Sequence, residues 1–125
     1  MNFSLTEEQV LLQDSVNKYV REHADVERHR RLIKTEQGFD PEAWRQFAEL
    51  GWLGLPFSEE LEGFGGGAVD LMVMTEAMGK GLLREPFLST VVTCGGFLAE
   101  AGNSDQQALY IEDIIAGQSQ WAFAF

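Results

Sequence analysis

The hydrophobic positions near the N-terminus repeat with a helical period. They recur at three- and four-residue steps: Val10 or Leu12, Val16, Tyr19 and Val20. This spacing places one apolar stripe on a helix that runs to about His23. Two overlapping capping boxes mark its start, Ser4 with Glu7 and Thr6 with Gln9.

A second helix is expected after a charged connector. Residues 24–39 carry no clear apolar period, so they indicate at most a partly helical connector. Asp40 and Pro41 then match an N-cap followed by proline at the first helical position. Gly51 supplies the stop. The apolar face of this helix comprises Ala43, Trp44, Phe47, Ala48 and Leu50.

The stretch 51–83 contains an apolar connector, an acidic segment, a glycine-rich turn and a third helix. Gly54 and Pro56 interrupt the connector and favour extended backbone there. Residues 68–83 read as a helix whose polar positions, Asp70, Glu76 and Lys80, are few. Such a helix should be packed on most sides, and we expect it to be the central one.

A nearly uncharged fourth helix is predicted from about residue 89 or 90 to residue 101, after a break at Glu85 and Pro86. Gly95 and Gly96 each cost about 1 kcal/mol relative to Ala inside a helix. They indicate close approach of another backbone or of a ligand.

A fifth helix should begin with a capping box formed by Ser104 and Gln107 and end at Gly117. The last five residues, WAFAF, alternate large and small side chains with the period of a strand. The pattern therefore predicts an all-α fold, an antiparallel bundle of about five helices over residues 1–117. Residues 118–125 would begin a β domain that the sequence does not include.

Charge and composition narrow the function. The net charge of -11 opposes binding to nucleic acid or to an anionic membrane. A basic cluster between Lys18 and Lys34 is typical of a solvated helix end. The sequence shows no signal peptide and no apolar stretch long enough to span a membrane. The single cysteine, Cys94, fits a cytoplasmic protein, and no metal site is expected.

Two motifs allow more than one interpretation. Gly63, Gly65 and Ala68 match the loose dinucleotide fingerprint, but acidic residues rather than a buried strand precede them. A tight turn into the third helix is the favoured interpretation. The hydroxyls of Ser89, Thr90 and Thr93 either line an apolar pocket or bond back to their own helix.

The order of these features resembles the N-terminal helical domain of the acyl-CoA dehydrogenase family. The resemblance rests on FSLTEEQ, ELGWLGLPFSEELEGFGGG, AVDLMVMTEAMGKGL, EPFLSTVV and AGNSDQQ, which leads to IIAGQSQWAFAF, and it covers nearly the whole chain. The sequence is most similar to bacterial branches that include the small subunit of pimeloyl-CoA dehydrogenase and heteromeric sterol side-chain enzymes.

This resemblance implies an FAD-dependent enzyme that oxidises an acyl-CoA thioester between its α and β carbons. Electron-transfer flavoprotein or a similar acceptor would reoxidise the flavin, and the enzyme would be a homo- or hetero-oligomer. The catalytic base of the family has no counterpart here, so the chain alone would be inactive. A non-catalytic interaction subunit or helical adaptor of a heteromeric dehydrogenase is the alternative.

The resemblance also assigns site residues. The fourth helix and the loop before it would form part of the acyl pocket, and the last segment would contact the flavin through Phe123 and Phe125. The implied pocket residues are Glu85, Phe87, Leu88, Ser89, Val92, Thr93 and Gly96.

Overall fold

The computed structural model describes residues 2–125, and these residues form helices and turns without a strand. The first half holds α1 (Glu7–His23), α2 (Val26–Leu32), α3 (Pro41–Glu49), the 3₁₀ turns η1 (Trp52–Gly54) and η2 (Glu59–Leu61), and α4 (Ala68–Lys80). The second half holds one helix composed of η3 (Leu88–Gly95) and α5 (Gly96–Ala101), and another composed of α6 (Ser104–Gln106), η4 (Gln107–Ile111) and α7 (Glu112–Ile115). The all-α prediction is confirmed, but the strand expected at the start of residues 118–125 is not present in the described chain.

Side-chain caps determine where the helices begin. The Thr6 hydroxyl accepts a hydrogen bond from the Gln9 amide at 3.2 Å, and the Gln9 side chain accepts one from the Thr6 amide at 3.0 Å. Asp40 caps α3 as predicted. The predicted box at residue 104 is wrong by one position, because Asn103 caps α6 and forms its box with Gln106. Asparagine is as good an N-cap as serine, so the helix begins one residue earlier.

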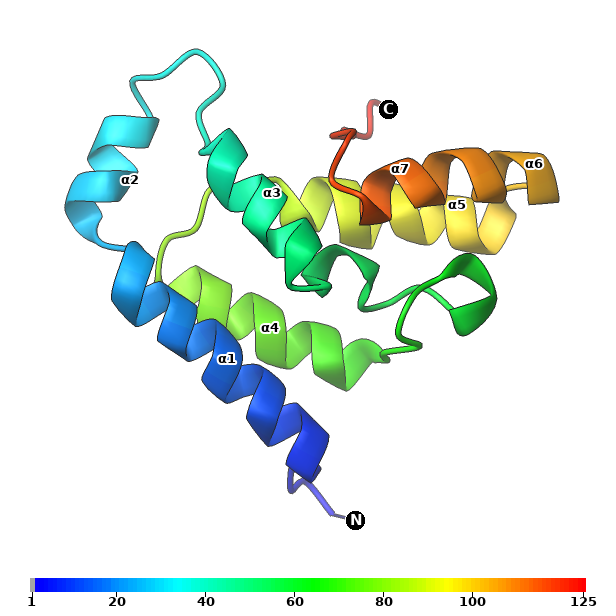
Figure 1. Ribbon diagram of the computed structural model, residues 1–125, viewed down its shortest axis with the longest axis horizontal. Helices are drawn as coiled ribbons and strands as arrows, with labels where there is room; N and C mark the ends of the chain where they lie inside the picture. The colour runs from blue at the N-terminus through cyan, green and yellow to red at the C-terminus, as the bar shows by residue number, and fades with distance from the viewer. Residues whose placement is uncertain (1) are drawn as a thin grey trace.

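Two kinds of helix pair build the bundle (Figure 1). The η3–α5 helix and the α6–α7 helix are antiparallel neighbours joined by a short turn, whereas α1 and α4 lie side by side and run in the same direction. A Cβ added at Gly81, just after α4, would lie 2.7 Å from the Val20 side chain of α1. The C-terminal ends of both helices therefore meet near α2.

The core lies where α1, α3, α4 and the two C-terminal helices converge. Its fully buried side chains include Val16, Phe47, Met74, Val91, Ile111 and Ile114. The third predicted helix is shorter than expected, since α4 ends at Lys80 rather than residue 83. It is also less enclosed, because Val69 and Met72 are exposed. Too few polar residues on a helix do not by themselves show that neighbours cover every face.

Candidate functional site

The nearly uncharged η3–α5 helix, predicted to form part of the acyl pocket, begins with π-type turns. Such turns are rare and concentrate at functional sites. A close approach is present at Gly95, but to a side chain rather than to the backbone or ligand that was predicted: an added Cβ would lie 2.5 Å from the ring of Phe57. At Gly96 the same position is open. Gly95 thus admits a core ring, while Gly96 leaves space at the surface of the helix.

One hollow lies between α4 and the start of this helix; we call it the Glu85 cavity. Its volume is about 180 Å³. Its lining is apolar apart from Thr75 and Glu85, and the Thr75 hydroxyl donates to the backbone oxygen of Leu71 at 2.7 Å. The lining residues are Thr75, Met78, Gly79, Leu83, Glu85, Phe87 and Leu88.

A second hollow of about 130 Å³ lies further along the same helix. The predicted pocket residues are therefore divided. Glu85, Phe87 and Leu88 line the Glu85 cavity, whereas Val92 and Gly96 line the second hollow with residues that include Pro56, Leu71 and Ala99. Ser89 and Thr93 belong to neither lining, and the Ser89 hydroxyl bonds back to the oxygen of Pro86 at 3.3 Å.

Glu85 is held by a buried ion pair. Its side chain is 0% exposed, and its Oε1 accepts a hydrogen bond from Arg28, whose side chain is 8% exposed. Asp40 adds a second carboxylate 3.8 Å from the same guanidinium. The other oxygen of Glu85, Oε2, is buried and has no hydrogen-bond partner among the described residues. One oxygen of this carboxylate is thus anchored, and the other is enclosed by protein atoms.

Arg28 is a residue that the sequence interpretation missed. It belongs to the basic cluster expected at a solvated helix end, yet it is buried because Glu85 lies opposite α2 in the fold. The only local signal was its capping residue, Asp25, whose side chain accepts from the Arg28 amide at 2.7 Å. Tyr19 lies in the same field, and burial, with the Glu85 charge as a smaller cause, raises the pKa of its phenol.

Thr90 ties the C-terminal segment to the η3–α5 helix. Its buried hydroxyl accepts from the Trp121 amide at 2.9 Å and donates to the Trp121 oxygen at 3.3 Å. The Trp121 ring meets Tyr110 edge to face, with ring centroids 5.1 Å apart. The sequence left two alternatives for the Thr90 hydroxyl, lining a pocket or bonding to its own helix. It does neither, because it bonds to the backbone of Trp121, 31 positions away.

We expect Thr90→Val to lower the free energy of unfolding by about 1–3 kcal/mol, because it leaves the Trp121 amide and carbonyl without this partner. Thr90→Ser should retain most of the stability. Thr93→Val, on the same helix, is the matched control. Urea unfolding measures all three, and an equal loss for the Thr90 and Thr93 valine variants would contradict the assignment.

Phe123 and Phe125 extend beyond this anchor. Phe123 stacks on Phe97 of α5 with ring centroids 5.1 Å apart and planes inclined by 7°. Phe125 stacks on Phe123 in turn, at 6.1 Å. All three rings are more than half exposed. The end of the described chain thus presents flat apolar faces beside α5.

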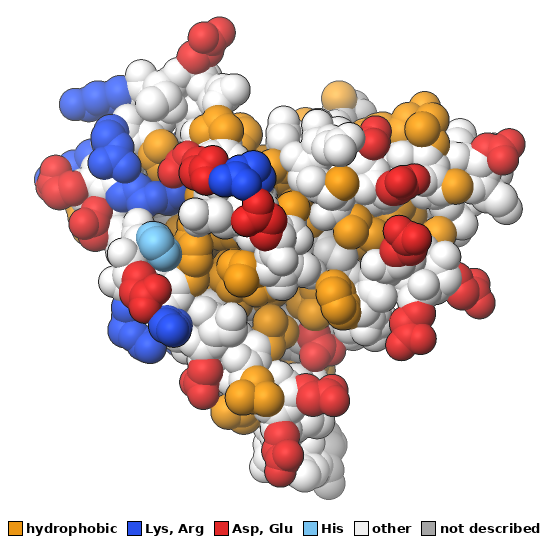
Figure 2. Space-filling model, viewed as in Figure 1, with side chains coloured by type: hydrophobic (Ala, Val, Ile, Leu, Met, Phe, Trp, Pro, Cys, Tyr) orange, Lys and Arg blue, Asp and Glu red, His pale blue; other side chains and the backbone are white. Residues whose placement is uncertain are grey.

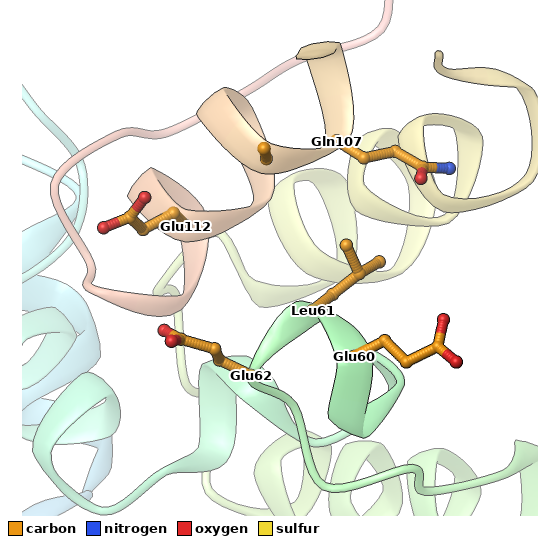
Figure 3. A pocket seen from close by; sticks show the side chains of 6 residues that line it. Glu60, Leu61, Glu62, Gln107 and Glu112 are labelled. Carbon is orange, nitrogen blue, oxygen red and sulfur yellow. The ribbon is translucent and has the colours of Figure 1, made fainter. Parts of the chain in front are cut away.

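A third hollow, between η2 and the α6–α7 helix, is acidic (Figure 3). Glu60, Glu62 and Glu112 line it together with Leu61 and Gln107. These carboxylates oppose binding of a CoA phosphate. Within residues 2–125 no group of three or more His, Cys, Asp or Glu side chains is arranged to hold a metal ion.

Positive and negative side chains gather at different ends of the molecule (Figure 2). Figure 2 shows Lys and Arg side chains gathered at the α2 end of the molecule, while carboxylates dominate the end where α5, α6 and α7 lie. Over the described part of the chain, no helix has the length and apolarity needed to cross a bilayer.

The glycine-rich turn is not a phosphate loop. The amides that would have to face a phosphate bond to the preceding connector instead: Gly65 N to Phe57 O at 2.7 Å and Gly66 N to Leu55 O at 2.8 Å. A Cβ at Gly63 would lie 2.1 Å from the Phe57 oxygen. The glycines therefore allow the turn to pack against residues 54–58, as the favoured interpretation predicted.

A family model and known relatives match most of the chain. The family model described as "Acyl-CoA dehydrogenase, N-terminal domain" matches residues 6–118. Acyl-CoA dehydrogenase IpdE2 of Mycolicibacterium smegmatis is 37% identical over 89 residues, which are 70% of this chain and 29% of that protein. The chain thus spans less than a third of that relative's length.

Two solved structures share the fold. A chain of the ChsE4–ChsE5 complex from Mycobacterium tuberculosis superimposes with a TM-score of 0.86 and 32% identity, covering 94% of this chain and 32% of that one. A chain of PigA with FAD and proline superimposes with a TM-score of 0.75 and 26% identity, covering 94% of this chain and 31% of that one.

Proposed function

Because the chain belongs to the acyl-CoA dehydrogenase family, as its N-terminal domain, we propose that it forms one wall of the acyl-binding site of an FAD-dependent enzyme. The reaction is the oxidation of an acyl-CoA thioester between its α and β carbons. The observation that supports this most is the Glu85 cavity, an apolar hollow formed jointly by α4 and the uncharged helix.

In this proposal the chain binds and orients the acyl group and excludes water from it. Met78, Leu83 and Phe87 supply apolar contact surface in the Glu85 cavity. Val92 and Gly96 extend that surface into the second hollow. Ser89 and Thr93 remain predictions from the family resemblance. No residue of this chain is proposed as the catalytic base, so the proton abstraction is assigned to another part of the protein.

FAD, when bound, would accept the hydride from the β carbon. Exposed, nearly parallel rings fit one edge of a planar cofactor, which supports contact with Phe123 and Phe125. Residues 118–125 contain no Lys or Arg, so this segment offers no cationic side chain to the cofactor phosphates. Retention of FAD by residues 1–125 alone is therefore not expected.

We further propose that the protein works in the cytoplasm as an oligomer and passes electrons to electron-transfer flavoprotein or a similar acceptor. The similarity to a chain of a two-protein complex supports a heteromeric assembly. The same similarity favours a second candidate function, a non-catalytic subunit that completes the site of a partner dehydrogenase.

The protein expressed from its complete coding sequence tests both candidates. It should be yellow and should reduce an artificial dye when given acyl-CoA substrates of increasing chain length. A yellow protein that needs a co-expressed partner for turnover would favour the subunit role. Colourless protein that is inert with and without partners would contradict the proposed function.

A further inference from the structure

We propose that the Glu85 cavity and the second hollow form one groove, which takes a plain alkyl chain of about twelve carbons. The carbons nearer the thioester lie in the second hollow, and the far end of the chain lies in the Glu85 cavity. Gly79 and Gly96 determine which lengths fit. The proposal rests on the proposed function, because it names the class of acyl group that the same site takes.

The same two helix faces line both hollows. On α4, Leu71 lines the second hollow, and Gly79, eight residues later on the same face, lines the Glu85 cavity. On the η3–α5 helix, Leu88 lines the Glu85 cavity, whereas Val92 and Gly96 line the second hollow. The two hollows therefore follow one another along the line where α4 and the η3–α5 helix meet.

Gly79 and Gly96 leave open space where a side chain would otherwise project. Gly79 lies in α4, and Gly96 lies within the continuous η3–α5 helix. A Cβ at either position would meet no neighbouring heavy atom within 4 Å, whereas one at Gly95 would lie 2.5 Å from the ring of Phe57. Glycine destabilises a helix relative to alanine, so packing against a neighbour explains Gly95 but not the other two. What Gly79 and Gly96 supply is room in the hollows that they line.

The volumes of the hollows indicate the length of the chain. An engineered cavity of about 150 Å³ binds benzene, so roughly 25 Å³ suffices for each carbon. The Glu85 cavity, about 180 Å³, would then hold about seven carbons, and the second hollow, about 130 Å³, about five. From Leu71 to Gly79 helix α4 rises about 12 Å, which matches about ten carbons of an extended chain. Length and volume thus agree on about ten to twelve carbons inside the groove.

The lining favours a plain hydrocarbon. The Thr75 hydroxyl is committed to the backbone oxygen of Leu71, and neither hollow is lined by Lys, Arg or His. Glu100, which lines the second hollow, is exposed and adds a negative charge. A carboxylate at the far end of the acyl chain would lie in the Glu85 cavity without a cation, because Arg28 already pairs with Glu85. An alkyl end leaves no polar group of the ligand unpaired.

The C-terminal segment indicates the direction of the chain. Phe123 stacks on Phe97, the residue after Gly96, with ring centroids 5.1 Å apart. Phe123 belongs to the proposed flavin contact, so the reacting carbons should lie beside the second hollow. The carbons farther from the thioester then extend along α4 toward Gly79.

S-alkyl-CoA thioethers test the proposal without turnover, because their α protons are not acidified by a thioester carbonyl. Dissociation constants of S-octyl-CoA and S-dodecyl-CoA would be measured by isothermal titration calorimetry on the protein expressed from its complete coding sequence. We expect S-dodecyl-CoA to bind at least tenfold more tightly, since its additional carbons enter the Glu85 cavity and each buried methylene is worth about fourfold. Equal binding would overturn the proposal.

Two variants test the order of the hollows. Gly79→Leu fills the Glu85 cavity, so S-dodecyl-CoA should lose at least tenfold in affinity while S-octyl-CoA stays within about twofold. Gly96→Leu fills the hollow nearer the thioester and should weaken both ligands by similar factors. A Gly79→Leu variant that weakens both ligands equally, or neither, would overturn the proposal.

Matched controls add the same side chain outside both linings. Glu76→Leu on α4 and Ala101→Leu on the η3–α5 helix lie at exposed positions and should change neither dissociation constant. If these controls lost the length preference as Gly79→Leu does, the assignment of the chain to the groove would be wrong.

A ligand of matched length tests the hydrocarbon requirement. S-(11-carboxyundecyl)-CoA should bind at least tenfold more weakly than S-dodecyl-CoA, because its terminal carboxylate would be desolvated in the Glu85 cavity without a cation. Equal or tighter binding of the carboxylate ligand would overturn this part of the proposal.

The outcomes separate the two proposals. A length preference that depends on Gly79, in a protein that never oxidises an acyl-CoA, would support the groove and contradict the dehydrogenase function. Dye reduction by acyl-CoA without tighter binding of S-dodecyl-CoA than of S-octyl-CoA would do the reverse.

Discussion

Arg28→Met should lower the free energy of unfolding by about 3–5 kcal/mol. This is the largest loss that we expect at any residue that the sequence placed on the surface. The reason is the charge left behind. Glu85 is fully buried, and without Arg28 the amide of Asp40 would be the hydrogen-bond donor left to its carboxylate among the described residues. Urea unfolding followed by circular dichroism measures the change.

Two variants serve as controls for this result. Arg28→Met/Glu85→Met removes both charges and should recover most of the stability, because well-packed apolar replacements of a buried pair are often neutral. Arg30→Met breaks an exposed pair with Glu27 on the same helix and should cost at most about 1 kcal/mol. Equal losses for Arg28→Met and Arg30→Met would show that the buried Arg28–Glu85 pair stabilises the fold no more than an exposed pair does.

Gly63→Ala should destabilise the protein by about 3 kcal/mol or more, the second large effect that we expect. The new methyl group would lie 2.1 Å from a backbone oxygen, that of Phe57, which cannot rotate away as a side chain could. The turn and the connector at residues 54–58 would have to separate. Loss of their hydrogen bonds would be visible as faster amide exchange at Gly65 and Gly66.

Gly65→Ala is the matched control in the same turn. Gly65 has a φ of +67°, but a Cβ there meets no heavy atom within 4 Å. Its cost should therefore be only the backbone term of about 1–2 kcal/mol. A Gly63→Ala variant as stable as Gly65→Ala would contradict the packing of the turn against residues 54–58.

The sequence predicted most of the helices because their signals are local. Thr6 with Gln9, Asp40 with Pro41, and Gly117 all lie next to the ends that they mark. The exception, the cap at Asn103, failed only because two adjacent residues can serve equally well. Local capping chemistry thus located these ends to within a residue, whereas the end of α4, which has no such cap, was predicted three residues too late.

The site was harder to predict because its contacts are distant in sequence. Arg28 and Glu85 are separated by 57 positions, and Thr90 bonds to Trp121 across 31. Hydrophobic periodicity carries no information about such pairs. The resemblance to a family predicted one helix as part of the acyl pocket, but not that its predicted residues divide between two hollows or that Gly79 of α4 lines one of them.

The proposed function requires the Glu85 cavity to receive the end of the acyl group. The direct measurement is kcat/KM of the protein expressed from its complete coding sequence, with acyl-CoA substrates of increasing length, for wild type and Gly79→Leu. We predict that Gly79→Leu shifts the preferred chain to a shorter length, because the added side chain occupies the cavity. An unchanged length profile in a folded, flavin-containing variant would contradict the account.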